Sequence, residues 1–128
     1  MTSDAELPRV PYQYALVRVV PRVHRGERLN VGVVLHCPQR DWIGARIQLD
    51  TTRLVAVDPH ADVDAITASL AAVQAATTTD QHHADSPGRR FGWITAPRST
   101  VVQPGPVHTG LTGDPATTMD ELFASLVA

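Results

Sequence analysis

Arginine side chains gather in one short stretch near the start of the chain, between residues 18 and 28. This stretch holds one acidic residue, Glu27, and four arginines: Arg18, Arg22, Arg25 and Arg28. A guanidinium group presents a planar fork of N–H donors that fits carboxylate and phosphate oxygens. We therefore expect the stretch to bind an anion. The alternative is a solvated hairpin tip whose charge is neutralised by Glu27 and by carboxylates elsewhere in the chain.

The residues around these arginines would shape the same loop. Gly26 allows a tight turn that could expose backbone N–H groups to an anion. Asn30 and Gly32 share one face of the following strand, which indicates either the floor of a site or a close approach of two backbones. A hydrogen bond from Asn30 that pins the loop is the competing interpretation. We expect Arg18, which falls within a strand, to be partly buried and paired.

A second polar cluster lies between residues 98 and 108. Arg98, Ser99 and Thr100 combine a forked cation with two hydroxyl groups, a mixture that can hold phosphate oxygens. His108 could join either cluster. An ordinary turn leading into a strand explains the same residues equally well.

Other kinds of chemistry are poorly supported. His82, His83 and Asp85 lack the spacing that fixes a metal site, so we expect no bound metal. Cys37 ends an apolar strand and is the only cysteine, which is typical of a small core residue. The sequence contains no glycine-rich nucleotide-binding motif, and no serine stands in a nucleophile elbow. We therefore assign no catalytic residue and no cofactor, and an enzyme is the least favoured class.

The composition indicates a single soluble domain. The chain has 128 residues, a net charge of -2 and a pI near 6.3, so it lacks the overall basic field of a general nucleic-acid binder. No apolar run approaches the roughly 20 residues that span a bilayer, and the first residues do not resemble a signal peptide. We expect a cytoplasmic protein without a membrane contact.

The apolar pattern predicts an α+β fold. Alternating residues predict strands over 12–20, 29–37 and 42–49, joined as an antiparallel meander. A short helix over 51–57 precedes a longer one, which Asp58 would cap and Pro59 would begin. Extended pieces after residue 90, interrupted by prolines, would form a later edge strand, and a closing helix begins at Pro115. We expect two or three helices on one face of the sheet, a polar arm over 1–11 and a flexible loop over 79–90.

Taken together, these stretches resemble a bacterial family known as domain of unknown function 3037. The resemblance rests on YALVRVVPRVHRGERLNVGVVLHC, on RFGWITAPRSTVVQPGPVHTGLTGDP and on the closing helix. It implies that the arginine-glycine-glutamate turn, here Arg25, Gly26 and Glu27, is a shared feature of the family. It transfers no catalytic residue. Some members are encoded beside a kinase resembling the persistence-toxin kinases, which implies a small partner or regulator.

The leading hypothesis is therefore a non-enzymatic interaction protein whose arginine-lined hairpin binds an acidic partner surface, with such a kinase as one candidate. Binding of nucleic acid or a phosphorylated ligand at the same surface is the alternative. A homodimer could also form, because the proline-broken edge strand could pair with a second copy or be protected by its prolines.

Overall fold

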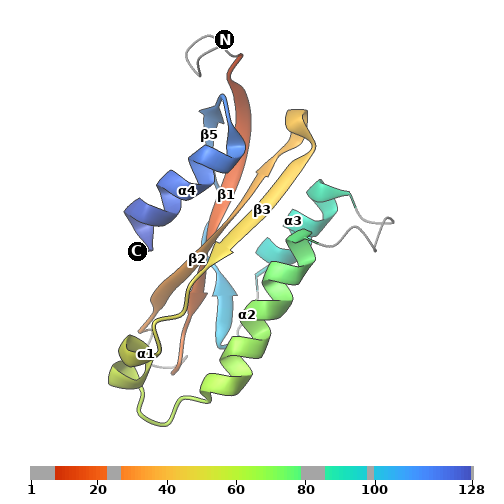
Figure 1. Cartoon of the computed structure of the whole chain (residues 1–128). Helices are drawn as coiled ribbons and strands as arrows, with labels where there is room; N and C mark the ends of the chain where they lie inside the picture. The colour runs from red at the N-terminus through yellow and green to blue at the C-terminus, as the bar shows by residue number, and fades with distance from the viewer. Residues whose placement is uncertain (1–7, 23–26, 79–85, 98–99, 128) are drawn as a thin grey trace.

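A five-stranded antiparallel sheet forms the centre of the computed structural model, which describes residues 8–22, 27–78, 86–97 and 100–127 (Figure 1). The long strand β1 (Val10–Val19) pairs on one side with β2 (Leu29–Cys37), which pairs with β3 (Trp42–Ile47). A 3-10 turn, Pro38–Arg40, joins β2 to β3. The other edge of β1 is shared by two short strands, β4 (Val102–Pro104) and β5 (His108–Thr112). The predicted meander is confirmed, and the expected late edge strand consists of two pieces.

Among the described residues, four helices cover both faces of this sheet. They are α1 (Thr51–Val57), α2 (Val63–Thr78), α3 (Pro87–Thr95) and α4 (Pro115–Leu126). Buried residues of α2 and α3 pack on one face with Val17 and Val34, whereas Met119 and Leu122 of α4 pack on the other face with Leu35. Figure 1 shows α2 and α4 on opposite sides of the strands.

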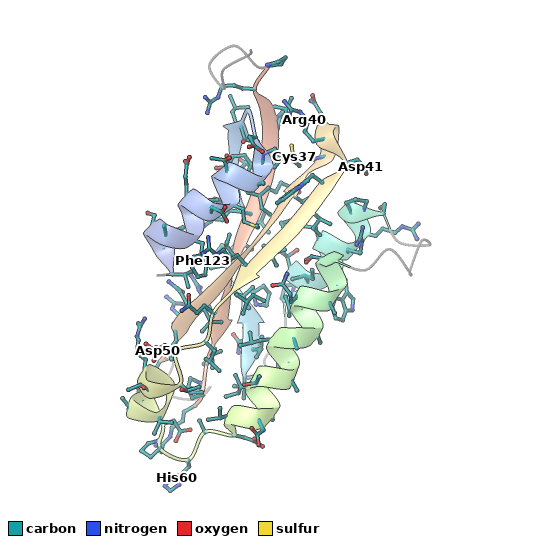
Figure 2. The ribbon with its side chains drawn as sticks, in the orientation of Figure 1. Cys37, Arg40, Asp41, Asp50, His60 and Phe123 are labelled. Atoms are coloured by element: carbon teal, nitrogen blue, oxygen red, sulfur yellow. The ribbon has the colours of Figure 1, made fainter. Side chains whose placement is uncertain are left out.

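The α+β class with an antiparallel sheet is confirmed, but the helices do not share one face as we had expected. The reason lies in β2, where neighbouring residues point to opposite faces and are buried alike. Val33, Val34 and Leu35 all have 0% exposure. A strand that is apolar on both sides requires cover on both sides. The closing helix α4 supplies the second cover, and its Phe123 points toward the sheet, with the Arg46 guanidinium 4.4 Å from its ring centre (Figure 2).

Two helix predictions need correction. The long helix begins at Val63 and not at Pro59, because Asp62 caps it by accepting a hydrogen bond from the Ala65 N–H, while the Asp58 carboxylate accepts from the His60 N–H. The segment after residue 86 was expected as loop and extended chain, but it forms α3. Ser86 caps this helix, and Phe91 and Ile94 lie on the same side of it, where they are buried in the core.

The boundaries of the arm and the loop also shift. Val10 and Pro11 belong to β1, and residues 87–90 are helical. The rest of the predicted loop, including His82, His83 and Asp85, lies outside the described residues, as does most of the predicted arm.

Candidate binding site

Arg18 lies where β1 meets two other strands. It stands opposite Asn30 of β2 and Gln103 of β4, and the register of the β1–β2 pair shifts between Val17 and Arg18. Such a bulge bends a strand and changes the direction of a side chain. The Arg18 side chain lies over Gly105, where an added Cβ would be 3.0 Å from the guanidinium carbon. A larger residue at position 105 would therefore crowd the guanidinium group in its present position.

The Arg18 guanidinium is short of partners. Its Nε atom is buried and has no hydrogen-bond partner among the described residues, so the expected pairing is not found. Burial lowers the pKa of Arg18 below its ordinary value, and the nearby charge of Arg28 lowers it further. An arginine stays protonated at neutral pH even so. The site thus holds a desolvated cation beside a second cation.

Asn30 joins this region to the closing helix. Its Nδ2 atom donates a hydrogen bond of 3.4 Å to the Leu126 carbonyl, in the last turn of α4. This contact supports the interpretation that Asn30 pins its surroundings. Gly32 allows a close backbone approach, because an added Cβ would lie 2.8 Å from Ile47 Cγ1 and 2.9 Å from the Arg46 carbonyl oxygen.

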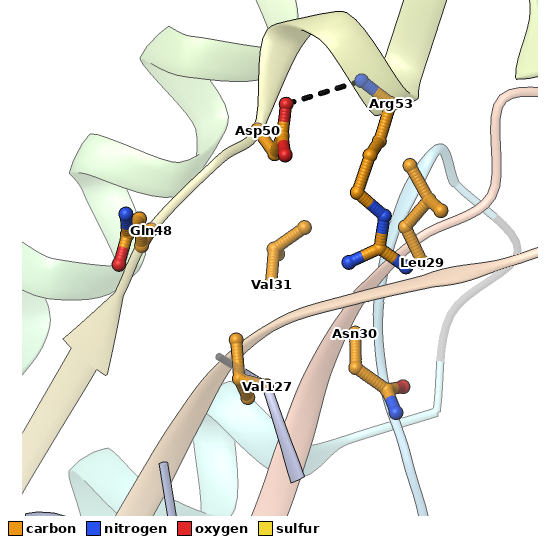
Figure 3. Close-up of a pocket in the computed structure, with 7 residues that line it drawn as sticks. All are labelled: Leu29, Asn30, Val31, Gln48, Asp50, Arg53 and Val127. Carbon is orange, nitrogen blue, oxygen red and sulfur yellow. Dashed lines mark hydrogen bonds between the residues drawn. The ribbon is translucent and has the colours of Figure 1, made fainter. Parts of the chain in front are cut away.

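A cavity of about 280 Å³ opens beside Asn30, where β2 extends beyond the end of β3 (Figure 3). Arg53 of α1 reaches into it, and its guanidinium lies toward Leu29. Asp50 caps α1 by accepting a hydrogen bond of 3.1 Å from the Arg53 N–H. The remaining lining residues are Val31, Gln48 and Val127. Sequence reasoning missed Arg53, because it stands 25 positions from Arg28 and no local motif surrounds it.

We call Arg18, Arg28 and Arg53 the arginine cluster. Arg18 stands opposite Asn30 on the neighbouring strand, and Arg53 enters the cavity from α1 on the side of β2 that carries Leu29 and Val31, away from the Asn30 side chain (Figure 3). In the part of the chain that the structure describes, no carboxylate oxygen lies within ion-pair distance of these three side chains. Their N–H groups can therefore donate hydrogen bonds to an external anion without first breaking an internal ion pair.

Arg22 has a different role. Its Nη2 atom lies 3.3 Å from the Asp58 Oδ1 atom, and Asp58 is buried at 6% exposure. The hydrogen bond from the His60 N–H lowers the pKa of Asp58, burial raises it, and the contact with Arg22 lowers it again, so that the net shift is downward. The carboxylate is therefore held ionised, and Arg22 fastens the end of β1 to the loop between α1 and α2.

The second predicted cluster is separated from the first. Thr100 donates its hydroxyl proton to the Val102 carbonyl, 2.7 Å away, and lines a groove beside α2. His108 stands opposite Tyr14, with ring centres 5.2 Å apart. Tyr14 and Arg18 are four residues apart on one strand, about 13 Å. Arg25, Gly26, Arg98 and Ser99 lie outside the described residues, and Glu27 is half-buried.

Metal and membrane sites are not found in the described ranges. They hold no group of three or more His, Cys, Asp or Glu side chains placed to bind a metal ion. None of their helices combines the length and apolar character needed to cross a bilayer. The buried thiol of Cys37 donates to the Pro11 carbonyl at 3.5 Å, as a core residue would.

A protein-family model described as protein of unknown function, DUF3037, matches residues 14–127. The chain belongs to the DUF3037 family. The match includes the arginine cluster, Asn30, the cavity and α4, so these features lie within the part that defines a DUF3037 protein. No curated protein and no solved structure matches the chain.

Proposed function

We propose that this DUF3037 protein is a non-enzymatic binding protein whose arginine cluster engages an acidic surface of a partner protein. The observation that carries the proposal is a group of three arginines around the start of β2, none of which pairs with a carboxylate among the described residues. Arg18 stands opposite Asn30, Arg28 is near Arg18, and Arg53 enters the cavity beside Asn30. A kinase resembling the persistence-toxin kinases, suggested by the family resemblance, is the first partner to test.

The burial of Arg18 favours the binding of an anion by the arginine cluster. A buried N–H donor without a partner costs about 1 to 3 kcal/mol, and repulsion from Arg28 adds to the cost. A partner carboxylate placed between Arg18 and Arg28 would reduce that repulsion. Hydrogen bonds between ionised groups are about twice as strong as neutral ones.

The surroundings favour a protein over nucleic acid. The chain carries a net charge of -2, and Asp50 lies within the cavity that Arg53 enters. A nucleic-acid strand would bring a row of phosphates past such carboxylates and be repelled by them. A folded acidic surface can place a few carboxylates against the cluster alone.

The test is a comparison of charge-reversed variants. Recovery and affinity of the kinase, or of another partner captured from the source cells, are measured for the wild-type chain, for Arg28→Glu and Arg53→Glu, and for Arg9→Glu. Arg9 is exposed near the start of β1 and lies far along the strand from Arg18. The Arg9→Glu variant therefore has the same change in net charge at a position away from the arginine cluster. We expect each cluster variant to weaken binding about tenfold and the control to have little effect.

Equal binding by all four proteins would contradict the proposal. The nucleic-acid alternative is tested by titrating single-stranded and double-stranded oligonucleotides at low and moderate salt. Phosphate binding weakens steeply with salt as counterion release becomes less favourable. Oligonucleotide affinity that falls with salt and is lost in the cluster variants would favour the alternative.

A further inference from the structure

A long groove runs beside α2 on the face of the sheet opposite α4. Its volume is about 520 Å³, and it extends from the Asp58 loop to Trp93 of α3. Between Asp62 and Val73 the helix wall rises about 16 Å, at 1.5 Å per residue. The opposite wall includes Thr100, Val101 and Val102. This groove shares no lining residue with the cavity that Arg53 enters.

The helix side of the groove is formed by small side chains. Ala65, Ser69 and Ala72 are exposed and line it, above the buried Ile66. At the far end, the Trp93 side chain is 57% exposed. A solvent-facing helix surface normally carries charged residues, whereas these positions carry none. Small residues also let a second helix approach closely.

The charges at the two ends of α2 are opposite. Asp62 stands exposed at its start and caps the helix. At its other end, the Arg90 Nη1 atom donates to the Ala76 carbonyl at 3.4 Å, and Arg89 is exposed beside it on α3. An antiparallel copy of the same helix would therefore bring acidic and basic ends together at both ends of the contact, and the helix dipoles would also be aligned favourably.

We propose that a second copy of this chain fills the groove, with α2 of each copy antiparallel to α2 of the other about a two-fold axis at Ser69. Positions equally distant from Ser69 then meet, so Asp62 of one copy lies against the Ala76 end of the other. Each α2 packs between the partner's α2 and its strand β4. A two-fold arrangement uses the same surface on both copies and closes as a dimer.

The edge of β4 favours this helix-mediated contact over strand pairing. Pro104 offers no N–H, and the Val102 carbonyl already accepts the Thr100 hydroxyl. An edge with so few open groups is protected against a second strand. The dimer that we infer therefore leaves the sheet edge unused and buries the groove.

Sedimentation velocity over a range of concentrations tests the proposal on the full chain. We expect the wild-type protein to form a dimer and Ser69→Arg to raise the dimer dissociation constant on the order of a hundredfold, because two arginines would face each other at the axis. Thr67→Arg is the matched control, since Thr67 is exposed but does not line the groove. Circular dichroism and thermal unfolding establish that each variant is folded.

Disulfide trapping provides a second readout that does not depend on the arginine variant. Under mild oxidation Ser69→Cys should form a covalent dimer rapidly, whereas Thr67→Cys should not, and Cys37 is buried and does not compete. A wild-type chain that sediments as a monomer at every concentration would overturn the proposal. So would cross-linking at equal rates in the two cysteine variants, or a folded Ser69→Arg variant that dimerises like the wild type.

Discussion

Two arginines near the end of β1, Arg18 and Arg22, lie four residues apart in opposite electrostatic surroundings. Arg22 contacts the buried carboxylate of Asp58 at 3.3 Å. Arg18 has a buried Nε without a partner among the described residues, and the charge of Arg28 lies near it. Within the part of the chain that the structure describes, one arginine therefore has a carboxylate partner and the other has none.

Under the proposed function, this difference separates a structural arginine, Arg22, from one that binds the partner, Arg18. An ion pair within the fold uses the donors of Arg22 to hold two segments together, so those donors are not available to a partner. A partly buried arginine without a carboxylate gains more from an external anion than a fully hydrated one, because part of its water has already been lost on folding. Substitutions in the two regions, and in the helix that joins them, test whether the two arginines differ in this way.

Helix α1 joins the two regions, so its core residue should give the largest effect. Leu54 has 0% exposure, follows Arg53 and precedes the loop that carries Asp58. Leu54→Ala should lower the free energy of unfolding by about 2 to 5 kcal/mol, measured by urea unfolding, and weaken partner binding as well. Val55→Ala, at an exposed neighbour, should change it by less than about 0.5 kcal/mol. Similar losses in both variants would mean that α1 does not organise the regions.

Replacing each arginine by methionine should separate stability from binding. Arg22→Met leaves Asp58 without its cation and should lower the Tm by roughly 3 °C, a modest loss because the Arg22 side chain is 36% exposed. Partner affinity should be retained. Arg18→Met removes an unsatisfied donor and keeps an apolar stem, so the Tm should stay or rise while affinity falls. Scanning calorimetry and titration calorimetry measure the two quantities, and the same outcome for both variants would contradict the distinction.

Much of this fold follows from local patterns. The strand over residues 29–37 and the helix over residues 51–57 have the predicted bounds, because alternation and capping are properties of neighbouring residues. Helix α3 was missed, although Ser86 and Pro87 form a good helix start. Phe91 and Trp93 favour strands by type, and the packing of Phe91 and Ile94 beneath the sheet decided the outcome.

The site was harder to predict than the fold. Arginine density directed attention to one stretch, but it could not show that Arg22 would meet Asp58, 36 residues away. Nor could it place Arg53 and Asn30 at the same cavity, since that placement depends on where β3 ends and α1 begins. Which arginine is paired and which is free is decided by tertiary contacts between distant segments, and no local spacing encodes them.

The ion pair of Arg22 should also have a pH signature. The folded-state pKa of Asp58 lies below its ordinary value of 3.8, so its ionised form stabilises the fold above that pH. This stabilisation is lost as the pH falls through the lower, folded-state pKa. Asp58→Asn, which retains a hydrogen-bond acceptor, should have a Tm roughly 2 °C lower than the wild type at pH 7. Thermal scans should show the gap closing below pH 3.8, and a gap that persists unchanged at pH 2 would contradict this account.

The smallest effect should come from the repulsion between Arg28 and Arg18. Arg28 is exposed, and its charge contributes to the lowered pKa of Arg18, so Arg28→Gln should raise the free energy of unfolding by a few tenths of a kcal/mol, on the order of 0.3. Salt screens exposed charges, so this gain should shrink as ionic strength rises from 0.01 to 0.5 M. Urea unfolding at both salt concentrations measures it, with Arg9→Gln as the control. A gain that is independent of salt would have a different origin, whereas a gain that vanishes with salt would show that the chain tolerates this repulsion in its unbound state.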